Sequence, residues 1–353
     1  MQAGQGVSGL AYWRAMQDLE GIRQLIQTPQ TIFITTHQNP DADAMGSSLG
    51  LAGYLKKHGH RVTVVTPTDY PDNLKWMSGT DEVLVFEEKT RVAVQQRLDD
   101  ADLIFCLDFS ALNRIRDLEP LVRQARGRKV LIDHHLEPEG FADALFWDDK
   151  AAATAELIYR LIEQLGDAEL VDTAIAECLY AGIMTDTGSF RHGSTTGDVH
   201  RVAAALLDVG IQVSTIHRRL FDNVSLDKLR FLGYVLNQKL VLLPAYKTAY
   251  ITITDEELKR FRSKSGDTEG MVNYALSVDG VVMAVILIDR GDEIKLSFRS
   301  VGDFSVRDLA SAHFGGGGHR NASGGRTTLS LEATVQRLLE VLPHYQDQLR
   351  QTA

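Results

Sequence analysis

Three side chains of the kinds that bind metal ions, His37, Asp41 and Asp43, lie close together in the segment 37–47. An imidazole and two carboxylates are costly to bring into one turn unless a positive charge lies among them, and a divalent cation would supply that charge. The alternative is that Asp43 caps the following helix while a neighbouring acid favours the helix dipole. Capping alone does not explain why His37 and Asp41 occupy the same turn.

The elements on either side place this segment on a turn between a strand and a helix. Residues 31–36 are β-branched and aromatic, which is typical of a buried strand. Residues 44–58 follow a helical pattern that Gly59 closes. Asn39-Pro40 favours an extended or turn backbone and keeps that segment from joining the helix.

Three further apolar runs, at 60–65, 102–108 and 128–135, are predicted as strands. Continuous apolar runs that alternate with helices predict a parallel sheet covered on both faces. Ligands of such sheets bind beyond the carboxyl ends of the strands. The polar residues at those ends should therefore lie at one edge of the sheet: His37, Asp41, Asp43, Asp108, Asp133, His134 and His135.

The remaining chain divides into two parts. Helices are predicted in the first part at 153–165, 172–184, 198–209 and 214–238. The second part has strand-like runs at 240–254 and 280–300, with helices at 255–263, 270–278, 305–314 and 331–349. We therefore expect an α/β protein with a parallel-sheet domain at 19–212, a helical linker at 213–238 and a smaller α+β domain at 239–345.

Composition limits the classes of function. The chain has 353 residues, of which 44% are hydrophobic, and this suffices for two domains with their own cores. A formal charge of −10 argues against binding of long duplex nucleic acid, although it permits a short anionic substrate. Cys106 and Cys178 lie in apolar runs and are predicted to be buried thiols in a reducing cytoplasm. No apolar segment suits a membrane span or a signal peptide, so we expect a cytoplasmic protein without membrane contact.

A run of glycines at 315–318, followed by His319, is the most unusual feature of the second part. Without Cβ atoms a backbone can approach a ligand closely and direct N–H groups at an anion, although a flexible turn is as common a role. Arg191 and Arg299 are further candidates for phosphate binding, since a guanidinium binds phosphate through two bonds. The alternative for each arginine is a surface ion pair, and for Asp186 a helix-capping role. The predicted substrate-binding residues are Arg191, Arg299, Gly316, Gly317, Gly318 and His319.

Four motifs, in chain order, resemble those of the DHH phosphoesterase superfamily. They are His37-x-Asn39-Pro40-Asp41-x-Asp43, the strand-end Asp108, Asp133-His134-His135 and Thr185-Asp186-Thr187-Gly188. The glycine run with His319 resembles the nucleotide-binding motif of the DHH-associated domain, so the resemblance spans residues 31–325. In detail the chain resembles bifunctional oligoribonucleases that also act as 3′-phosphoadenosine 5′-phosphate phosphatases.

This resemblance implies two divalent metal ions, usually manganese, in the cleft between the two domains. His37, Asp41 and Asp108 would bind one ion. The other would be bound by Asp43, Asp108, His134 and Asp186, with Asp108 shared. Asp133 and His135 would be catalytic groups beside the ions, Asp133 by orienting a ligand imidazole and His135 by contacting the transferred phosphoryl group.

We expect an enzyme that hydrolyses short oligoribonucleotides and linear dinucleotides to mononucleotides and dephosphorylates 3′-phosphoadenosine 5′-phosphate. The alternatives are a cyclic-dinucleotide phosphodiesterase, a RecJ-like single-strand exonuclease and a nucleotide sensor without catalysis. The acidic charge and modest length argue against the RecJ-like alternative, which needs a basic and aromatic channel. The glycine–histidine segment disfavours an inorganic pyrophosphatase of the same superfamily. We expect no partner beyond these substrates except a second copy in a homodimer.

Overall fold

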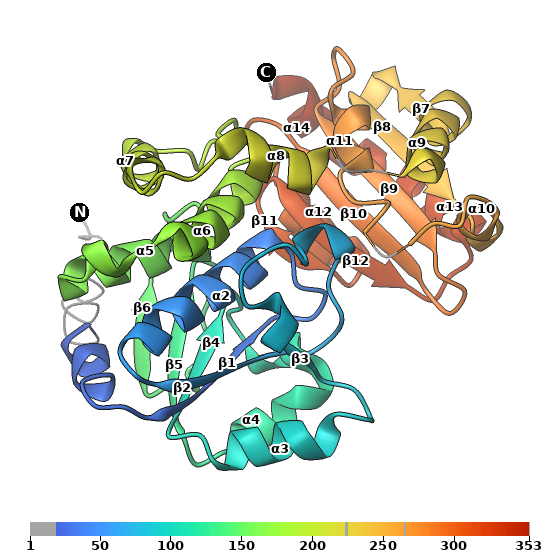
Figure 1. The fold of residues 1–353 in the computed structure, drawn as a ribbon. Helices are drawn as coiled ribbons and strands as arrows, with labels where there is room; N and C mark the ends of the chain where they lie inside the picture. The colour runs from blue at the N-terminus through green and yellow to red at the C-terminus, as the bar shows by residue number, and fades with distance from the viewer. Residues whose placement is uncertain (1–18, 223–224, 265, 353) are drawn as a thin grey trace, which may run out of the picture. The chain divides into compact units, whose positions relative to one another are not determined.

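The computed structural model describes residues 19–222, 225–264 and 266–352. The chain forms two compact units, Met1–Asn223 and Val224–Ala353, and each contains one six-stranded sheet (Figure 1). Helices α8 (Val213–Phe221) and α9 (Leu226–Gln238) replace the single helix predicted at 214–238. The predicted segment is helical but not continuous, because α8 ends at Phe221 and a new helix begins after Ser225, whose hydroxyl accepts a hydrogen bond from the Lys228 N–H.

The sheet of the first unit has the order β3-β2-β1-β4-β5-β6, and every neighbouring pair is parallel, as predicted. Its strands are β1 (Thr31–Thr36), β2 (Arg61–Thr66), β3 (Leu84–Val85), β4 (Leu103–Leu107), β5 (Arg128–Asp133) and β6 (Ala144–Trp147). The edge strands β3 and β6 were not predicted, since both are too short to show a hydrophobic pattern.

Helices cover both faces of this sheet (Figure 1). One face packs against α2 (Ala42–Lys57), α5 (Thr154–Leu165) and α6 (Thr173–Asp186), and α7 (Gly197–Asp208) lies on α6. The other face is covered by α3 (Arg91–Asp99) and α4 (Glu119–Gln124), neither of which was predicted from the sequence. Alternation along β1 divides the core, because Ile34 faces α2 and Phe33 faces the opposite layer.

The contact between α2 and α6 depends on glycine. A Cβ on Gly46 would lie 2.3 Å from the carbonyl oxygen of Cys178, so a larger residue would push the helices apart. Helix α2 begins earlier than predicted because Asp41 is its N-cap, accepting hydrogen bonds from the N–H groups of Asp43 and Ala44. The capping role weighed for Asp43 thus belongs to Asp41.

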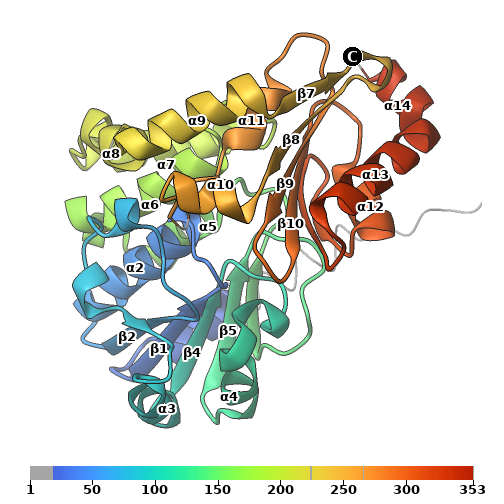
Figure 2. The same ribbon diagram turned by 90° about the vertical axis from the view of Figure 1, so that its right-hand side faces the viewer.

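The second unit is built on a mixed sheet of order β11-β12-β10-β9-β8-β7, in which only the β8–β9 pair is parallel among the described strands. Its strands are β7 (Leu240–Leu243), β8 (Thr248–Ile253), β9 (Met283–Asp289), β10 (Ile294–Ser300), β11 (Gly317–His319) and β12 (Ala322–Thr327). As Figure 2 shows, one face carries α9, α10 (Asp255–Arg260) and α11 (Met271–Leu276). The opposite face carries α12 (Val306–His313), α13 (Leu331–Val341) and α14 (Gln346–Gln351).

One prediction for the second unit needs correction. The helix predicted at 331–349 is interrupted by a 3₁₀ turn at Leu342–Tyr345, where Pro343 cannot continue the hydrogen-bonding of an α-helix.

Within the described ranges, no single helix has the length and apolar character to cross a membrane. The helices α7 and α8, which are bent by 110° relative to each other, have the length and composition of a span only when they are taken together.

Candidate active site

Two of the predicted metal ligands follow the two central strands of the first sheet. His37 follows β1 and Asp108 follows the adjacent β4. The chain proceeds from β1 to β2 and β3 on one side and to β4, β5 and β6 on the other, so the strand order reverses between these neighbours. Open α/β sheets bind ligands beyond the carboxyl ends of their strands at such a point.

A first cluster contains His37, Asp41 and Asp108. The Nε2 atom of His37 lies 3.4 Å from Oδ2 of Asp108 and 3.9 Å from Oδ2 of Asp41. The Nδ1 atom of His37 lies 2.8 Å from the carbonyl oxygen of Gln38. This contact fixes the ring orientation and leaves Nε2 as the atom presented to the carboxylates.

A second cluster surrounds His134. Its Nε2 atom lies 3.5 Å from Oδ1 of Asp108, 3.6 Å from Oδ2 of Asp186 and 3.9 Å from Oδ2 of Asp43. Its Nδ1 atom lies 3.2 Å from the carbonyl oxygen of Ala151. Asp108 therefore turns Oδ2 toward His37 and Oδ1 toward His134, so that one carboxylate faces both clusters.

The side chains in these two clusters shift one another's pKa values. Burial would lower the pKa of His37, but the hydrogen bond to Asp108 and the charges of Asp41 and Asp108 outweigh it and raise that pKa to about 9. The pKa of His134 rises to about 10, because the Asp108 contact likewise outweighs burial. Burial would raise the pKa of Asp108, but hydrogen bonds from His134 and His37 hold it well below its ordinary value. The two imidazoles thus retain protons where positive charge is needed.

The pKa values of two further carboxyl groups are raised, whereas that of Asp108 is lowered. Burial and the nearby Asp108 and Asp41 raise the pKa of Asp43, although two backbone N–H groups oppose the change. Burial and the charges of Asp43 and Asp41 also raise the pKa of Asp186. A divalent cation would satisfy both kinds of group at once, and mixed imidazole and carboxylate donors suit such an ion.

The N-terminus of α5 completes the second cluster, and its contribution was not predicted from the sequence. The Asp43 carboxylate is fully buried and accepts hydrogen bonds from the N–H of Thr154 at 2.7 Å and of Ala155 at 2.8 Å. The Thr154 hydroxyl donates to Oδ1 of Asp108 at 2.9 Å. The only sequence signal was the position of Thr154 at the start of the helix predicted at 153–165.

Asp108 itself has an unusual backbone. Its φ angle is +64°, in the left-handed region that few non-glycine residues adopt. Such conformations persist where the surroundings enforce them, and they are concentrated at functional sites. The residue is also only 2% exposed, so its side chain is buried.

Asp133 orients a different histidine from the one expected. Its Oδ1 atom lies 2.8 Å from Nδ1 of His135, whereas the Nδ1 atom of His134 contacts the carbonyl oxygen of Ala151. The expectation that Asp133 orients a predicted ligand imidazole is therefore wrong. The reason is the turn after β5, which directs two consecutive histidines to different partners.

The two candidate arginines lie in different units. Arg191 is exposed in the turn after α6, and its Nε atom donates to the carbonyl oxygen of Gly188 at 2.7 Å. Arg299 is half-buried in β10, and burial lowers its pKa while Glu269 opposes that shift. The Nη1 atom of Arg299 donates to the carbonyl oxygen of Phe298 at 2.9 Å.

The glycine run forms a β-hairpin, since Gly317–His319 of β11 pairs with β12. A Cβ on Gly316 would lie 1.9 Å from the carbonyl oxygen of Gly324, and Gly318 has a φ angle of +140°. These two glycines are therefore required by the hairpin. A Cβ on Gly317 would have no atom within 4 Å, so this position leaves space beside the backbone.

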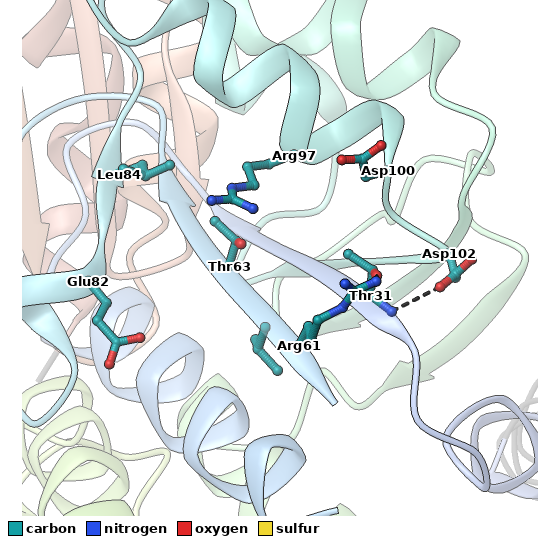
Figure 3. Close-up of a pocket in the computed structure, with 9 residues that line it drawn as sticks. Thr31, Arg61, Thr63, Glu82, Leu84, Arg97, Asp100 and Asp102 are labelled. Atoms are coloured by element: carbon teal, nitrogen blue, oxygen red, sulfur yellow. Dashed lines mark hydrogen bonds between the residues drawn. The ribbon is translucent and has the colours of Figure 1, made fainter. Parts of the chain in front are cut away.

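A polar pocket of about 650 Å³ lies elsewhere in the first unit (Figure 3). It is lined by Thr31 and Arg61, at the amino ends of β1 and β2, and by Arg97, Asp100 and Asp102. These residues lie at the opposite end of the strands from His37 and Asp108. Its charges are mixed, and it contains none of the predicted site residues.

Two family models match the chain: the N-terminal domain of the DHH family over residues 31–183 and the DHHA1 domain over residues 247–346. The chain is 32% identical to the bifunctional oligoribonuclease and PAP phosphatase NrnA of Thermus thermophilus, over 94% of both chains. It is 28% identical to the Bacillus subtilis protein of the same name, over 83% of this chain and 88% of that one. An exopolyphosphatase-related protein from Bacteroides fragilis has a solved structure with a TM-score of 0.91 and 36% identity, over 95% and 98% of the two chains.

The chain therefore belongs to the DHH–DHHA1 phosphoesterases, and it is a hydrolase of that family. Its buried histidine and aspartate clusters are of the kind that bind divalent metal ions.

Proposed function

We propose that this phosphoesterase binds two divalent metal ions, with Mn²⁺ as the first candidate. One ion would be bound by His37, Asp41 and Asp108. The other would be bound by Asp43, Asp108, His134 and Asp186. The observation that carries this proposal is the orientation of Asp108, whose two oxygens face His37 and His134 separately. When bound, such a pair of ions activates water at neutral pH and stabilises charge on the attacking and leaving oxygens of a phosphate ester.

His135 is the proposed catalytic group of the protein itself. Its Nδ1 atom is fixed by Asp133, and its ring lies beside His134, with centroids 4.8 Å apart. The Asp133 carboxylate holds one tautomer and orientation, so that Nε2 is the atom assigned to the phosphoryl group. Asp133 is fully buried, which makes it a rigid support.

The proposed substrates are short oligoribonucleotides, linear dinucleotides and 3′-phosphoadenosine 5′-phosphate. The names of the Thermus and Bacillus relatives support this class. The chain's net charge of −10 also favours a short anionic substrate bound by a local set of cations over a long duplex. The residues proposed to bind substrate are Arg191, Arg299, Gly316, Gly317, Gly318 and His319. We assign catalysis to residues 19–212, substrate recognition to 239–345 and their connection to 213–238.

A substrate panel tests the proposal. Metal-free and Mn²⁺-loaded protein would be incubated with 3′-phosphoadenosine 5′-phosphate, di- to pentanucleotide RNA, a cyclic dinucleotide, pyrophosphate and a long single strand. We expect Mn²⁺-dependent release of mononucleotides from the shortest RNAs, slower turnover per bond as RNA lengthens, and release of phosphate from the bisphosphorylated adenosine.

Other outcomes would redirect the assignment. Fastest turnover of the cyclic dinucleotide would support the signalling phosphodiesterase. Equal rates on long and short strands would support the RecJ-like exonuclease. Mn²⁺-loaded protein that binds nucleotides but hydrolyses no member of the panel would support the alternative of a nucleotide sensor without catalysis.

A further inference from the structure

Three donors from the N-terminus of α5 contact two of the proposed metal ligands. The N–H groups of Thr154 and Ala155 donate to Asp43, and the Thr154 hydroxyl donates to Asp108. Thr154 is therefore in contact with both carboxylates, and its side chain is fully buried. A buried hydroxyl with a single well-placed acceptor constrains the rotation of that acceptor.

Rotation of the Asp108 carboxylate matters because one of its oxygens faces His37 and the other faces His134. An Asp carboxylate turns easily about its last side-chain torsion, for which the energy wells are broad. The histidine nitrogens that now contact Asp108, at 3.4 and 3.5 Å, are themselves proposed ligands and would donate no hydrogen bond to it once they coordinate an ion. Thr154 supplies a donor that metal binding leaves in place.

The position of Thr154 is itself well fixed. The buried carboxylate of Glu156 accepts a hydrogen bond from the N–H of Ala152 at 2.7 Å, and Arg160 lies 3.5 Å from the same carboxylate. Arg160 also contacts Asp148 at 3.2 Å. These contacts connect the first turns of α5 to the loop that precedes it, and the carbonyl of Ala151 in that loop contacts His134.

We infer that Thr154 is a positioning residue for Asp108, which keeps one carboxylate oxygen directed at each of the two metal positions. The inference rests on the proposed dinuclear site and extends it to a residue that no motif contains. Its hydroxyl acts on the geometry of Asp108 and does not touch the substrate. Groups that orient metal ligands in this way affect metal affinity by roughly ten- to hundredfold.

The test compares Thr154→Val, which keeps the shape and loses the donor, with Thr154→Ser, which keeps the hydroxyl. Both retain the backbone N–H to Asp43. Thr334→Val is the matched control, because Thr334 is also fully buried in a helix and its hydroxyl donates to the carbonyl of Ser330, but it lies in the second unit. Mn²⁺ would be titrated by calorimetry, and coupling between two Mn²⁺ ions would be followed by electron paramagnetic resonance.

We expect Thr154→Val to bind at least one ion roughly tenfold or more weakly and to lose or change the exchange-coupled spectrum, whereas Thr154→Ser and Thr334→Val resemble the wild type. If Thr154→Val does not fold, Thr154→Ala is compared with Thr154→Ser in the same two measurements. A folded variant without the hydroxyl that binds both ions with wild-type affinity and coupling would overturn the role of Thr154 alone. Wild-type protein that binds no pair of ions would overturn the dinuclear site and this inference with it.

Discussion

A Cβ atom on Gly182 would lie 2.8 Å from Oδ1 of Asp43. Gly182 lies inside α6, where alanine would otherwise be the better helix former, and the same Cβ would lie 2.8 Å from the side chain of Ala155. Glycine at this position therefore lets Asp43 reach the N-terminus of α5.

Gly182→Ala should displace Asp43 and weaken metal binding. We expect a loss of stability of about 1–3 kcal/mol from overpacking and a decrease in Mn²⁺ affinity of roughly tenfold or more. Gly233→Ala is the control, since Gly233 also lies inside a helix but its Cβ would have no atom within 4 Å. That control should gain stability of about 0.5–1 kcal/mol. Urea unfolding and Mn²⁺ titration would measure both, and equal behaviour of the two variants would contradict the packing explanation.

Replacing Asp108 tests the shared carboxylate. Asp108→Asn is preferable to alanine, because asparagine tolerates the φ angle of +64° and keeps the size of a buried side chain. We expect turnover to fall at least about a thousandfold, roughly 4 kcal/mol of transition-state stabilisation, with loss of one or both ions. Metal analysis and single-turnover rates would test this. Retention of two ions with normal turnover would exclude the shared role.

The pKa values of His37 and His134 predict how stability depends on pH. In the metal-free protein these values are about 9 and about 10, above the ordinary value of about 6.5 for an unfolded chain. The folded state then binds more protons than the unfolded state between pH 6.5 and 10, so stability is present at low pH and is lost as pH rises through that window. The raised pKa values of Asp43 and Asp186 act in the same direction, whereas the lowered pKa of Asp108 acts in the opposite direction.

Metal ions should reverse this trend. Coordination requires deprotonated imidazoles, so the apparent Mn²⁺ affinity rises with pH. Thermal unfolding from pH 6 to 8.5 should show Tm of the metal-free protein falling, while the increase in Tm caused by Mn²⁺ grows. A metal-induced increase that is the same at every pH would mean that His37 and His134 do not exchange protons for metal.

Arg299 allows substrate binding to be separated from metal chemistry. It belongs to β10 of the second unit, whereas every proposed metal ligand belongs to the first. Arg299→Ala should leave Mn²⁺ affinity unchanged and lower kcat/KM for nucleotides by about 1.5–3 kcal/mol, the value of a hydrogen bond to a charged group. Turnover of a small phosphodiester such as bis(p-nitrophenyl) phosphate should change little.

The control for this variant is Arg337→Ala, because Arg337 is an exposed arginine on α13 of the same unit. Equal losses on the nucleotide and on the small diester would mean that Arg299 supports the metal site or the fold. An unchanged rate on both would remove Arg299 from the substrate-binding set.

Two of the candidate glycines, Gly316 and Gly317, should behave differently. Gly316→Ala should disrupt the hairpin and destabilise the second unit, since its Cβ would overlap the carbonyl oxygen of Gly324. Gly317→Ala has space for the new methyl group and should fold normally. A fall in nucleotide affinity for folded Gly317→Ala, read by circular dichroism and equilibrium binding, would support close approach of a ligand. Unchanged affinity would limit the role of the glycines to the hairpin.

Local patterns in the sequence determined the framework of this site. The apolar run at 31–36 coincides with β1, and the polar residues after the runs at 102–108 and 128–135 do lie together. This was predictable because parallel strands bring their carboxyl ends to one edge whatever the loops between them do. The short elements β3, β6, β11 and β12 were missed, because each depends on a neighbouring strand more than on its own pattern.

Contacts between distant residues were decided only by the tertiary structure. Thr154 contacts Asp108, and Gly182 makes room for Asp43, through packing of helices far apart in the chain. The partner of Asp133 is His135 rather than His134, because the turn after β5 sets the direction of each ring. The sequence thus determined which residue types gather at the sheet edge, since that follows from strand order. Which atom contacts which depends on side-chain rotamers and close packing that exist only in the folded chain.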